Sequence, residues 1–292
     1  MKPGRLDVGI VGAGRVGVVV GAALREAGHR VVAASGVSEA SVTRIDALLP
    51  GVPRVDPEAV VRAADLIVIA VPDDALSDVV SGLAAVGAWR VGQIAVHTSG
   101  RYGLAPLAPA ARLGVTGIAL HPAMTFTGTS LDLTRMRDAV FAVTAPPPVL
   151  PIGLALAVEL GGEGVVVDDA MRPLYHAALV QGANHVVGAV AQSLKLLAEA
   201  GIEAPTRVLG PLLRASIEGA LADAPGSLAT LTGPVVRGDA GTIRAHMDAL
   251  VAHPEELATY RELAGVIARL ARDGGRLDAA QYSGVMKALA TD

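Results

Sequence analysis

Six residues near the start of the chain, Gly12-Ala13-Gly14-Arg15-Val16-Gly17, have the spacing of a phosphate-binding turn. They follow an apolar segment with strand character, Leu6–Val11, and precede a segment with helix character, Val18–Ala27. In such a strand–turn–helix unit, the first glycine permits a sharp turn and the second lets the backbone approach a pyrophosphate. The third lets the helix pack against the strand. Because N–H groups at a helix N-terminus bind phosphates, all six residues are predicted to hold a dinucleotide.

The end of the second expected strand, His29–Ala34, bears on which dinucleotide binds. Enzymes that use NAD carry an Asp or Glu here, whose carboxylate binds the ribose 2′-hydroxyl. This chain has Ser35-Gly36-Val37-Ser38 instead, and Arg44 follows a little downstream. The small hydroxyl residues Ser35 and Ser38 leave room for a 2′-phosphate, so we expect NADP, with NAD possible. The alternative is an ordinary polar loop that does not select the cofactor.

The third expected strand, Asp65–Val71, is almost wholly apolar, as is typical of a strand buried on both faces. Ligands of open α/β sheets bind beyond the carboxyl ends of the strands. We therefore expect Val71, Pro72 and Asp73 to border the cofactor. For Asp73 and its neighbour Asp74 we favour a second role, as the N-terminal cap of the helix Ala75–Ala85.

Two further strand ends carry side chains that could act on a substrate. The strand Gln93–His97 is followed by Thr98-Ser99-Gly100, and hydroxyl and N–H groups at a glycine turn suit an anion or the cofactor. His97 itself is expected to be buried. The strand Thr116–Leu120 ends in His121-Pro122, and a histidine at such a position can donate a proton near neutral pH. Both Ser99 and His121 have the alternative of a purely structural role.

The remaining candidates lie in the second half of the chain. His176 and Asn184 belong to a long expected helix, Met171–Ala200. Asn184 is the only asparagine in the chain, and an amide buried among small apolar residues needs a partner such as a substrate. Arg237, in the expected loop Leu231–Asp239, could bind a substrate carboxylate through two hydrogen bonds. Alternatively, Asp239 caps the next helix and Arg237 pairs with it.

The elements that must position these residues change character once along the chain. About eight strand-like segments alternate with helices up to residue 168, including Ala139–Thr144 and Gly164–Val167, which predicts a doubly wound, largely parallel sheet. From Asp169 the hydrophobic period is helical. The later helices are expected at Pro205–Ala222 (bent or broken near Gly210-Pro211), Ala240–Val251, Pro254–Ala271 and Asp278–Ala290, the last of which opens with a capping-box pattern at Asp278 and Gln281. We therefore predict an α/β protein with a Rossmann domain at 1–168 and an all-α domain at 169–292.

The composition disfavours several other classes of protein. The 292 residues have a formal net charge of -4, scattered arginines and few aromatic residues, which disfavours nucleic-acid binding. There is no cysteine in the sequence, so disulfides and thiol chemistry are excluded, and the seven histidines lack metal-ligand spacing. We expect no metal. Since no apolar run approaches the eighteen or so residues of a membrane span, we also expect no membrane contact and a cytoplasmic location.

Six segments between residues 9 and 239 carry a family resemblance: GIVGAGRVG, IAVPDDAL, HTSG, ALHPAMTF, YHAALVQGAN and LTGPVVRGD. In them the chain resembles oxidoreductases that pair a Rossmann-like domain with a helical domain of unassigned function. These belong to the superfamily of 6-phosphogluconate and 3-hydroxyisobutyrate dehydrogenases, ketopantoate reductase and pyrroline-5-carboxylate reductase. The resemblance implies NAD(P)H-dependent reduction of a small carbonyl or imine acid. It also implies that the turn at Ser99 holds a substrate carboxylate, as in 3-hydroxyacid dehydrogenases.

The chain departs from those relatives at one point. The 3-hydroxyacid dehydrogenases and ketopantoate reductases usually place a catalytic lysine on the helix corresponding to Met171–Ala200, whereas here Lys195 lies about three turns beyond Asn184. Proton donation would then fall to a histidine, a hydroxyl or water. Our leading prediction is an NADP-dependent reductase of a small 2-oxo acid, specifically 2-dehydropantoate (ketopantoate). The first alternative is an imine reductase of the pyrroline-5-carboxylate reductase type. The second is a non-catalytic NADP-binding regulatory protein.

The helical half also predicts self-association. Its helices are rich in small residues and apolar on nearly all sides, so each needs burial from more than one direction. We therefore expect a homodimer formed through this half.

Overall fold

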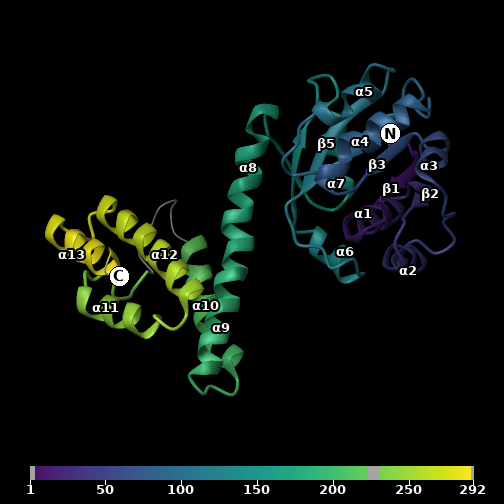
Figure 1. The fold of residues 1–292 in the computed structure, drawn as a ribbon. Helices are drawn as coiled ribbons and strands as arrows, with labels where there is room; N and C mark the ends of the chain where they lie inside the picture. Colours follow the sequence, from purple (N-terminus) through teal and green to yellow (C-terminus); the bar gives the residue numbers. More distant parts are fainter. Residues whose placement is uncertain (1–3, 223–230, 291–292) are drawn as a thin grey trace. The chain divides into compact units, whose positions relative to one another are not determined.

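The computed structural model describes residues 4–222 and 231–290 (Figure 1). The chain forms two compact units, Met1–Gly182 and Ala183–Asp292. The sheet ends at Val166 and all later elements are helical in the part of the chain that the structure describes, which confirms the predicted change of character near Asp169. The domain boundary after residue 168 stays a prediction, because the first helical residues, up to Gly182, belong to the first unit.

The first unit is built on a seven-stranded sheet with the strand order β2-β1-β3-β4-β5-β6-β7. The strands are β1 Asp7–Val11, β2 Arg30–Ser35, β3 Leu66–Ile69, β4 Ile94–His97, β5 Thr116–Pro122, β6 Val140–Thr144 and β7 Glu163–Val166. The doubly wound, largely parallel sheet is confirmed, although the expected number of strands was one too high. The pair β5–β6 is antiparallel, which was not anticipated. The only α-helix between these two strands is short, α6 (Leu131–Met136), and antiparallel neighbours need no long crossover helix.

Helices flank this sheet (Figure 1). Besides α6 they are α1 Arg15–Glu26, α2 Glu39–Leu48, α3 Pro57–Ala63, α4 Asp73–Ala85, α5 Ala108–Ala111 and α7 Leu150–Glu159. Strand β3 shows how both faces are covered. Leu66 and Val68 belong to one hydrophobic cluster, whereas Ile67 and Ile69 belong to another. The prediction that this strand is buried on both faces is therefore confirmed.

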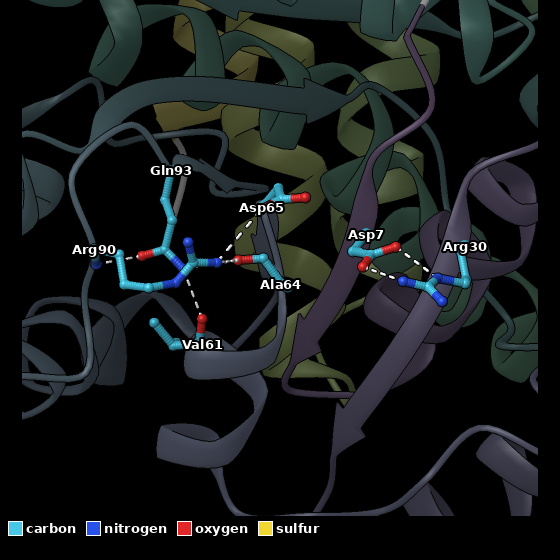
Figure 2. Close-up of polar contacts among 7 residues, drawn as sticks. All are labelled: Asp7, Arg30, Val61, Ala64, Asp65, Arg90 and Gln93. Carbon is cyan, nitrogen blue, oxygen red and sulfur yellow. Dashed lines mark hydrogen bonds and ion pairs between the residues drawn. The ribbon is translucent and has the colours of Figure 1, made fainter.

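At the amino-terminal edge of the sheet, side chains form hydrogen bonds with backbone groups (Figure 2). The buried Gln93, directly before β4, donates from Nε2 to the carbonyl oxygens of Val61 and Ala64 at 2.7 and 2.8 Å. Arg90 donates from Nη2 to the Ala64 carbonyl oxygen at 2.8 Å, and its backbone N–H donates to Gln93 Oε1 at 2.6 Å. Because these polar groups are satisfied within the fold, this edge is structural. Ligand chemistry is expected at the opposite, carboxyl edge.

A run of helical residues follows the sheet. It consists of a 3₁₀ turn at Asp169–Met171, helix α8 (Arg172–Leu179), a π-helical turn at Val180–Asn184 and helix α9 (His185–Glu199). The sequence predicted one uninterrupted α-helix from Met171. π-Turns are rare and arise locally, so helical periodicity alone does not locate them.

The second unit contains α9 and four further helices. These are α10 Pro205–Ala222, α11 Ala240–Ala249, α12 Pro254–Asp273 and α13 Ala279–Ala290. Helix α10 includes Pro211 without being broken there. The predicted capping box before α13 is confirmed, because Gln281 N–H donates to Asp278 Oδ1 and Asp278 N–H donates to Gln281 Oε1. Within the described ranges, 4–222 and 231–290, no helix is both long and apolar enough to cross a membrane.

Candidate functional site

The three glycines of the phosphate-binding turn meet different steric demands. Gly12 has φ +88°, and a Cβ built there would lie 2.8 Å from Val71 Cγ1. A Cβ on Gly17 would lie only 2.3 Å from the Gly12 carbonyl oxygen, so α1 can pack this closely only with glycine. At Gly14 a Cβ would meet nothing within 4 Å, and this residue forms the N-cap of α1. The open space at a helix N-terminus is where a pyrophosphate would fit.

A cavity of about 380 Å³ lies at this carboxyl edge, within the first unit. It is lined by Gly14, Arg15, Val16, Ala70, Val71, Pro72, Asp73, Thr98, Ser99, Gly100, His121 and His176. The cavity therefore brings together residues that the sequence singled out at the ends of β1, β3, β4 and β5. His176 joins them from α8. The predicted cofactor-binding turn, His121 and His176 therefore share one cavity.

Two predicted cofactor residues have structural partners. The buried Ser35 hydroxyl accepts from Gly12 N–H at 3.2 Å, and the Ser35 carbonyl oxygen accepts from Ala13 N–H at 2.7 Å. The Ser38 hydroxyl caps α2 by accepting from Ser41 N–H at 3.1 Å. Both serines thus support the turn and the helix beside it.

The aspartates after β3 do not cap α4 as expected. The N-cap is Pro72, without a side-chain hydrogen bond, and both Asp73 and Asp74 lie in the first helical turn. Carboxylates in this turn still interact favourably with the helix dipole. The correction follows from the helix beginning two residues earlier than the sequence pattern suggested, with Asp73 at the cavity wall.

Two arginines converge on the loop that follows β5. A Cβ built on Gly128 would lie 2.8 Å from Arg44 Nε and 3.1 Å from Arg15 Cγ. The carboxylate of Asp132, in the first turn of α6, accepts from the N–H groups of Thr127 and Gly128 in this loop, each at 2.7 Å. The loop is therefore held beside the guanidinium group of Arg44 and the side-chain stem of Arg15, and Arg15 also lines the cavity.

His97 is buried in the end of β4, as predicted. Its side chain has no exposed surface, its Nδ1 accepts from Ser99 N–H at 3.2 Å and its Nε2–H donates to the Gly103 carbonyl oxygen at 2.7 Å. Burial lowers the pKa of His97 to about 4, although the hydrogen bond to Gly103 opposes the shift. His97 is a neutral ring that fixes the loop after β4.

His121 lies inside the cavity wall and contacts α8. Its Nδ1 lies 2.9 Å from the Tyr175 hydroxyl, and its ring is T-shaped against those of Tyr175 and His176. Burial is the main cause that lowers the pKa of His121 to about 4, and the positive charge of Arg172 adds to it. The expectation that His121 titrates near neutral pH is therefore wrong: the ring is uncharged at pH 7. It can still act as an N–H hydrogen-bond donor.

Two residues at this site were assigned no role by the sequence analysis. Arg172 is fully buried, and Tyr175 meets His121 across 54 positions of sequence. An arginine before Pro173 and one of four tyrosines carry no pattern that marks them. The only available signal was the adjacency of Tyr175 to the predicted His176.

The predicted residues Asn184 and Arg237 lie in the second unit. Asn184 is exposed, so the expectation of a buried amide is wrong. It is the last residue of the π-turn. Arg237 is also exposed, and Asp239 caps α11 by accepting from Thr242 N–H at 3.0 Å, as the structural alternative predicted.

The second unit has a cavity of its own, of about 310 Å³, lined mostly by apolar residues of α9, α11, α12 and the segment 231–236. Lys195 donates from Nζ to Glu256 Oε1 at 2.8 Å, so this lysine is held in an ion pair within the unit. Among the residues the structure describes, no cluster of three or more His, Cys, Asp or Glu is arranged to hold a metal ion.

The two neutral histidines predict an acid-sensitive fold. The pKa values of His97 and His121 are lowered from 6.5 to about 4 in the folded protein. The unfolded chain therefore binds more protons between these values, and stability is lost as pH falls from 6.5 towards 4. For each histidine, acidification from pH 7 to pH 5 is expected to lower the free energy of unfolding by about 2 kcal/mol. Urea denaturation at the two pH values measures this change.

A matched pair of variants on β4 tests this prediction. His97→Gln should reduce the loss of stability on acidification, because the titrating group is gone. Val96→Ala, at a buried neighbour that does not titrate, should lower stability equally at both pH values. An unchanged pH dependence in His97→Gln would contradict the assignment.

Comparison with known families matches two parts of the chain. Residues 1–122 match the family model described as a Rossmann-like domain, and residues 139–267 match the model described as a domain of unknown function, DUF2520. The chain thus combines a Rossmann-like N-terminal domain with a DUF2520 domain. No curated protein matches the sequence significantly.

Solved structures share this fold over nearly the whole chain. A provisionally named NADP oxidoreductase from Bacteroides fragilis is 22% identical, with a TM-score of 0.76, covering 91% of this chain and 98% of its own. An imine reductase from Myxococcus stipitatus, in complex with NADP+, is 15% identical with a TM-score of 0.63 and covers 98% and 100%. A 1-pyrroline-5-carboxylate reductase from Streptococcus pyogenes is 13% identical with a TM-score of 0.60 and covers 91% and 99%. At these identities the likeness establishes the fold.

Proposed function

We propose that this protein is an NADP(H)-dependent reductase that acts on the C=N bond of a small imine. The observation that carries the proposal is the single cavity that joins the open helix N-terminus at Gly14 to the uncharged His121. Gly14, Arg15 and Val16 would hold the dinucleotide phosphates. The reduced nicotinamide supplies a hydride when bound, so the protein needs to provide binding, orientation and hydrogen bonds.

The protonation state of His121 favours an imine substrate over a carbonyl substrate. A protonated imine already carries its proton and becomes a neutral amine on accepting a hydride, whereas a carbonyl becomes an alkoxide that needs an acid. His121 is uncharged at neutral pH, and its ring N–H is a weak acid. The described residues that line the cavity include no lysine. The fold shared with an imine reductase and with 1-pyrroline-5-carboxylate reductase supports the same choice.

The second candidate is reduction of a small 2-oxo acid, with 2-dehydropantoate as the specific case. The turn at Ser99 and Gly100 lines the cavity and could hold a carboxylate. A neutral imidazole N–H can also polarise a carbonyl oxygen, so His121 would act there as a hydrogen-bond donor.

A screen of NADPH oxidation separates these functions. The substrates are cyclic imines, including 1-pyrroline-5-carboxylate, and 2-oxo acids, including 2-dehydropantoate, with NADH in parallel. Turnover of imines above oxo acids supports the proposal, and the reverse order supports the second candidate. Tight NADPH binding without turnover on either set would indicate the non-catalytic regulatory alternative. Absence of NADPH binding by calorimetry would overturn all three.

Arg15, in the glycine turn, and Arg44 both approach Gly128, which predicts that NADP binds in preference to NAD. A 2′-phosphate is recognised by charge-assisted hydrogen bonds from guanidinium groups. Arg44→Ala is expected to weaken NADPH binding by about 10–100-fold and to change NADH binding little. Isothermal titration with both cofactors measures the ratio. Equal losses for the two cofactors, or tighter NADH binding in the parent protein, would contradict NADP selection.

We also propose that the chain forms a homodimer through its helical half. Helices α9 and α10 contain no buried residue, although α10 carries the large apolar side chains of Val208, Leu212 and Leu221 on its exposed surface. Large apolar side chains exposed on a helix that has no buried residue mark an interaction surface. Light scattering at micromolar concentration should give twice the monomer mass. Leu212→Glu should shift the protein to monomer, and a monomeric parent protein would refute the proposal.

A further inference from the structure

Arg172, the first residue of α8, has the largest fully buried side chain among the residues that the structure describes. Its Nε donates to Thr144 Oγ1 at 2.8 Å, and Nη2 donates to the carbonyl oxygens of Ala119 and Ala142 at 2.9 Å each. Nη1 donates to the Ser99 carbonyl oxygen at 3.4 Å. One guanidinium group therefore joins β5 and β6 to the segment that follows β4.

All of these acceptors are uncharged oxygens. Burial lowers the pKa of Arg172 to about 10, so the group keeps its positive charge at neutral pH. Burying a cation without a carboxylate in contact is costly, and hydrogen bonds to carbonyl oxygens offset only part of that cost. Packing alone does not explain an arginine here, because an apolar side chain would fill the same space without the desolvation cost.

The guanidinium group of Arg172 contacts the elements that carry Tyr175 and His121. Its Cζ is 5.9 Å from the centre of the Tyr175 ring, and Tyr175 is one helical turn further along α8. Ala119, which accepts from Nη2, lies two positions before His121 on β5. Arg172 therefore binds the strand that carries His121 and belongs to the helix that carries Tyr175.

We propose that Arg172 is a positioning residue that fixes the hydrogen bond from the Tyr175 hydroxyl to His121 Nδ1. Burial is the main cause that keeps the His121 ring neutral, and the positive charge of Arg172 adds to it. With Nδ1 accepting, the ring hydrogen is on Nε2. This atom would lie 3.0 Å from a Cβ built on Gly100, a residue of the cavity wall. The N–H group of Nε2 is then the donor offered to a substrate. Only this last step rests on the proposed reductase function.

The groups that surround His121 agree with a neutral ring. His176 and His97 contribute to lowering its pKa together with Arg172 and burial. The Tyr175 hydroxyl is protonated at neutral pH, because burial raises the pKa of Tyr175. The charges of Asp73 and Asp169 raise the pKa of His97 and so oppose the effect of its burial. Asp169 also accepts from Leu104 N–H at 2.9 Å.

NMR of the protein labelled with ¹⁵N-histidine tests the proposal without any substrate. In the parent protein His121 should show the Nε2–H tautomer and a pKa of about 4. Arg172→Met should raise this pKa by about one unit or more and mix the tautomers, whereas Arg172→Lys, which keeps the charge, should stay within about half a unit of the parent. Tyr175→Phe should mix the tautomers with Arg172 intact.

Arg90→Met is the matched control. Arg90 also donates to a backbone carbonyl oxygen, that of Ala64, but at the opposite edge of the sheet. It should lower the melting temperature and leave the His121 spectrum unchanged. A folded Arg172→Met protein with the parent's tautomer and pKa would overturn the proposal. If Arg172→Met does not fold, an unchanged tautomer in Tyr175→Phe overturns it instead.

A kinetic readout separates this proposal from the proposed function. With a substrate from the screen, Arg172→Met should lower kcat about 10–100-fold with little change in the KM for NADPH, and Arg172→Lys should recover part of kcat. If no substrate is turned over, the proposed function fails while the NMR result still decides the role of Arg172.

Discussion

Replacing His121 by alanine is expected to lower kcat by about 100–1000-fold, with little change in NADPH affinity. In the tautomer proposed for His121, the ring presents its Nε2–H to the cavity, and removing one positioned donor from a reacting site typically costs that much. Steady-state kinetics on the best substrate of the screen, with calorimetric NADPH titration, measures both quantities.

The pH dependence gives an independent check on His121. Its Nδ1 must be unprotonated to accept from the Tyr175 hydroxyl, and its pKa is lowered to about 4. The rate of the parent protein should therefore show no His121 step between pH 8 and pH 5, and should fall only as pH approaches 4. His246→Ala, at an exposed histidine of the second unit, is the matched control for kcat and should match the parent. A His121→Ala protein with the parent's kcat would refute the catalytic role.

Replacing Gly17 by valine is expected to weaken NADPH binding by about 100-fold or more and to destabilise the fold. Even the first carbon of a side chain would lie 2.3 Å from the Gly12 carbonyl oxygen and 3.1 Å from Ala70 Cβ. Since backbone atoms cannot move aside easily, α1 must shift and its N-terminus leaves the phosphate position. Calorimetric titration and thermal melting report the two effects.

Two other glycines separate binding from folding. Gly14→Ala meets nothing within 4 Å in the protein, so it should leave the melting temperature nearly unchanged yet weaken NADPH binding if a pyrophosphate approaches there. Gly82→Ala, in the exposed face of α4, should raise stability by about 0.5–1 kcal/mol and leave binding unaltered. NADPH affinity that is unchanged in both Gly14→Ala and Gly17→Val would place the cofactor elsewhere.

The sequence by itself determined those features that depend on neighbouring residues. The glycine spacing located the turn between β1 and α1, the apolar run of β3 indicated burial on both faces, and the change of period located the helical region near Asp169. The same holds for the capping box at Asp278 and Gln281. Each of these signals lies within a few positions of chain, where backbone geometry and hydrophobic period are read directly.

The tertiary structure decided the state of the candidate site. The neutral ring of His121 depends on its burial and on Arg172, and its hydrogen bond depends on Tyr175. Both residues are more than fifty positions away in sequence. The buried position of the Arg172 guanidinium also depends on distant residues, because its acceptors lie on β5, on β6 and in the segment after β4. The tertiary structure also leaves Asn184 exposed to solvent, where the sequence predicted a buried amide. Burial, charge and hydrogen-bond partners are properties of what folding brings together, and local sequence patterns do not contain them.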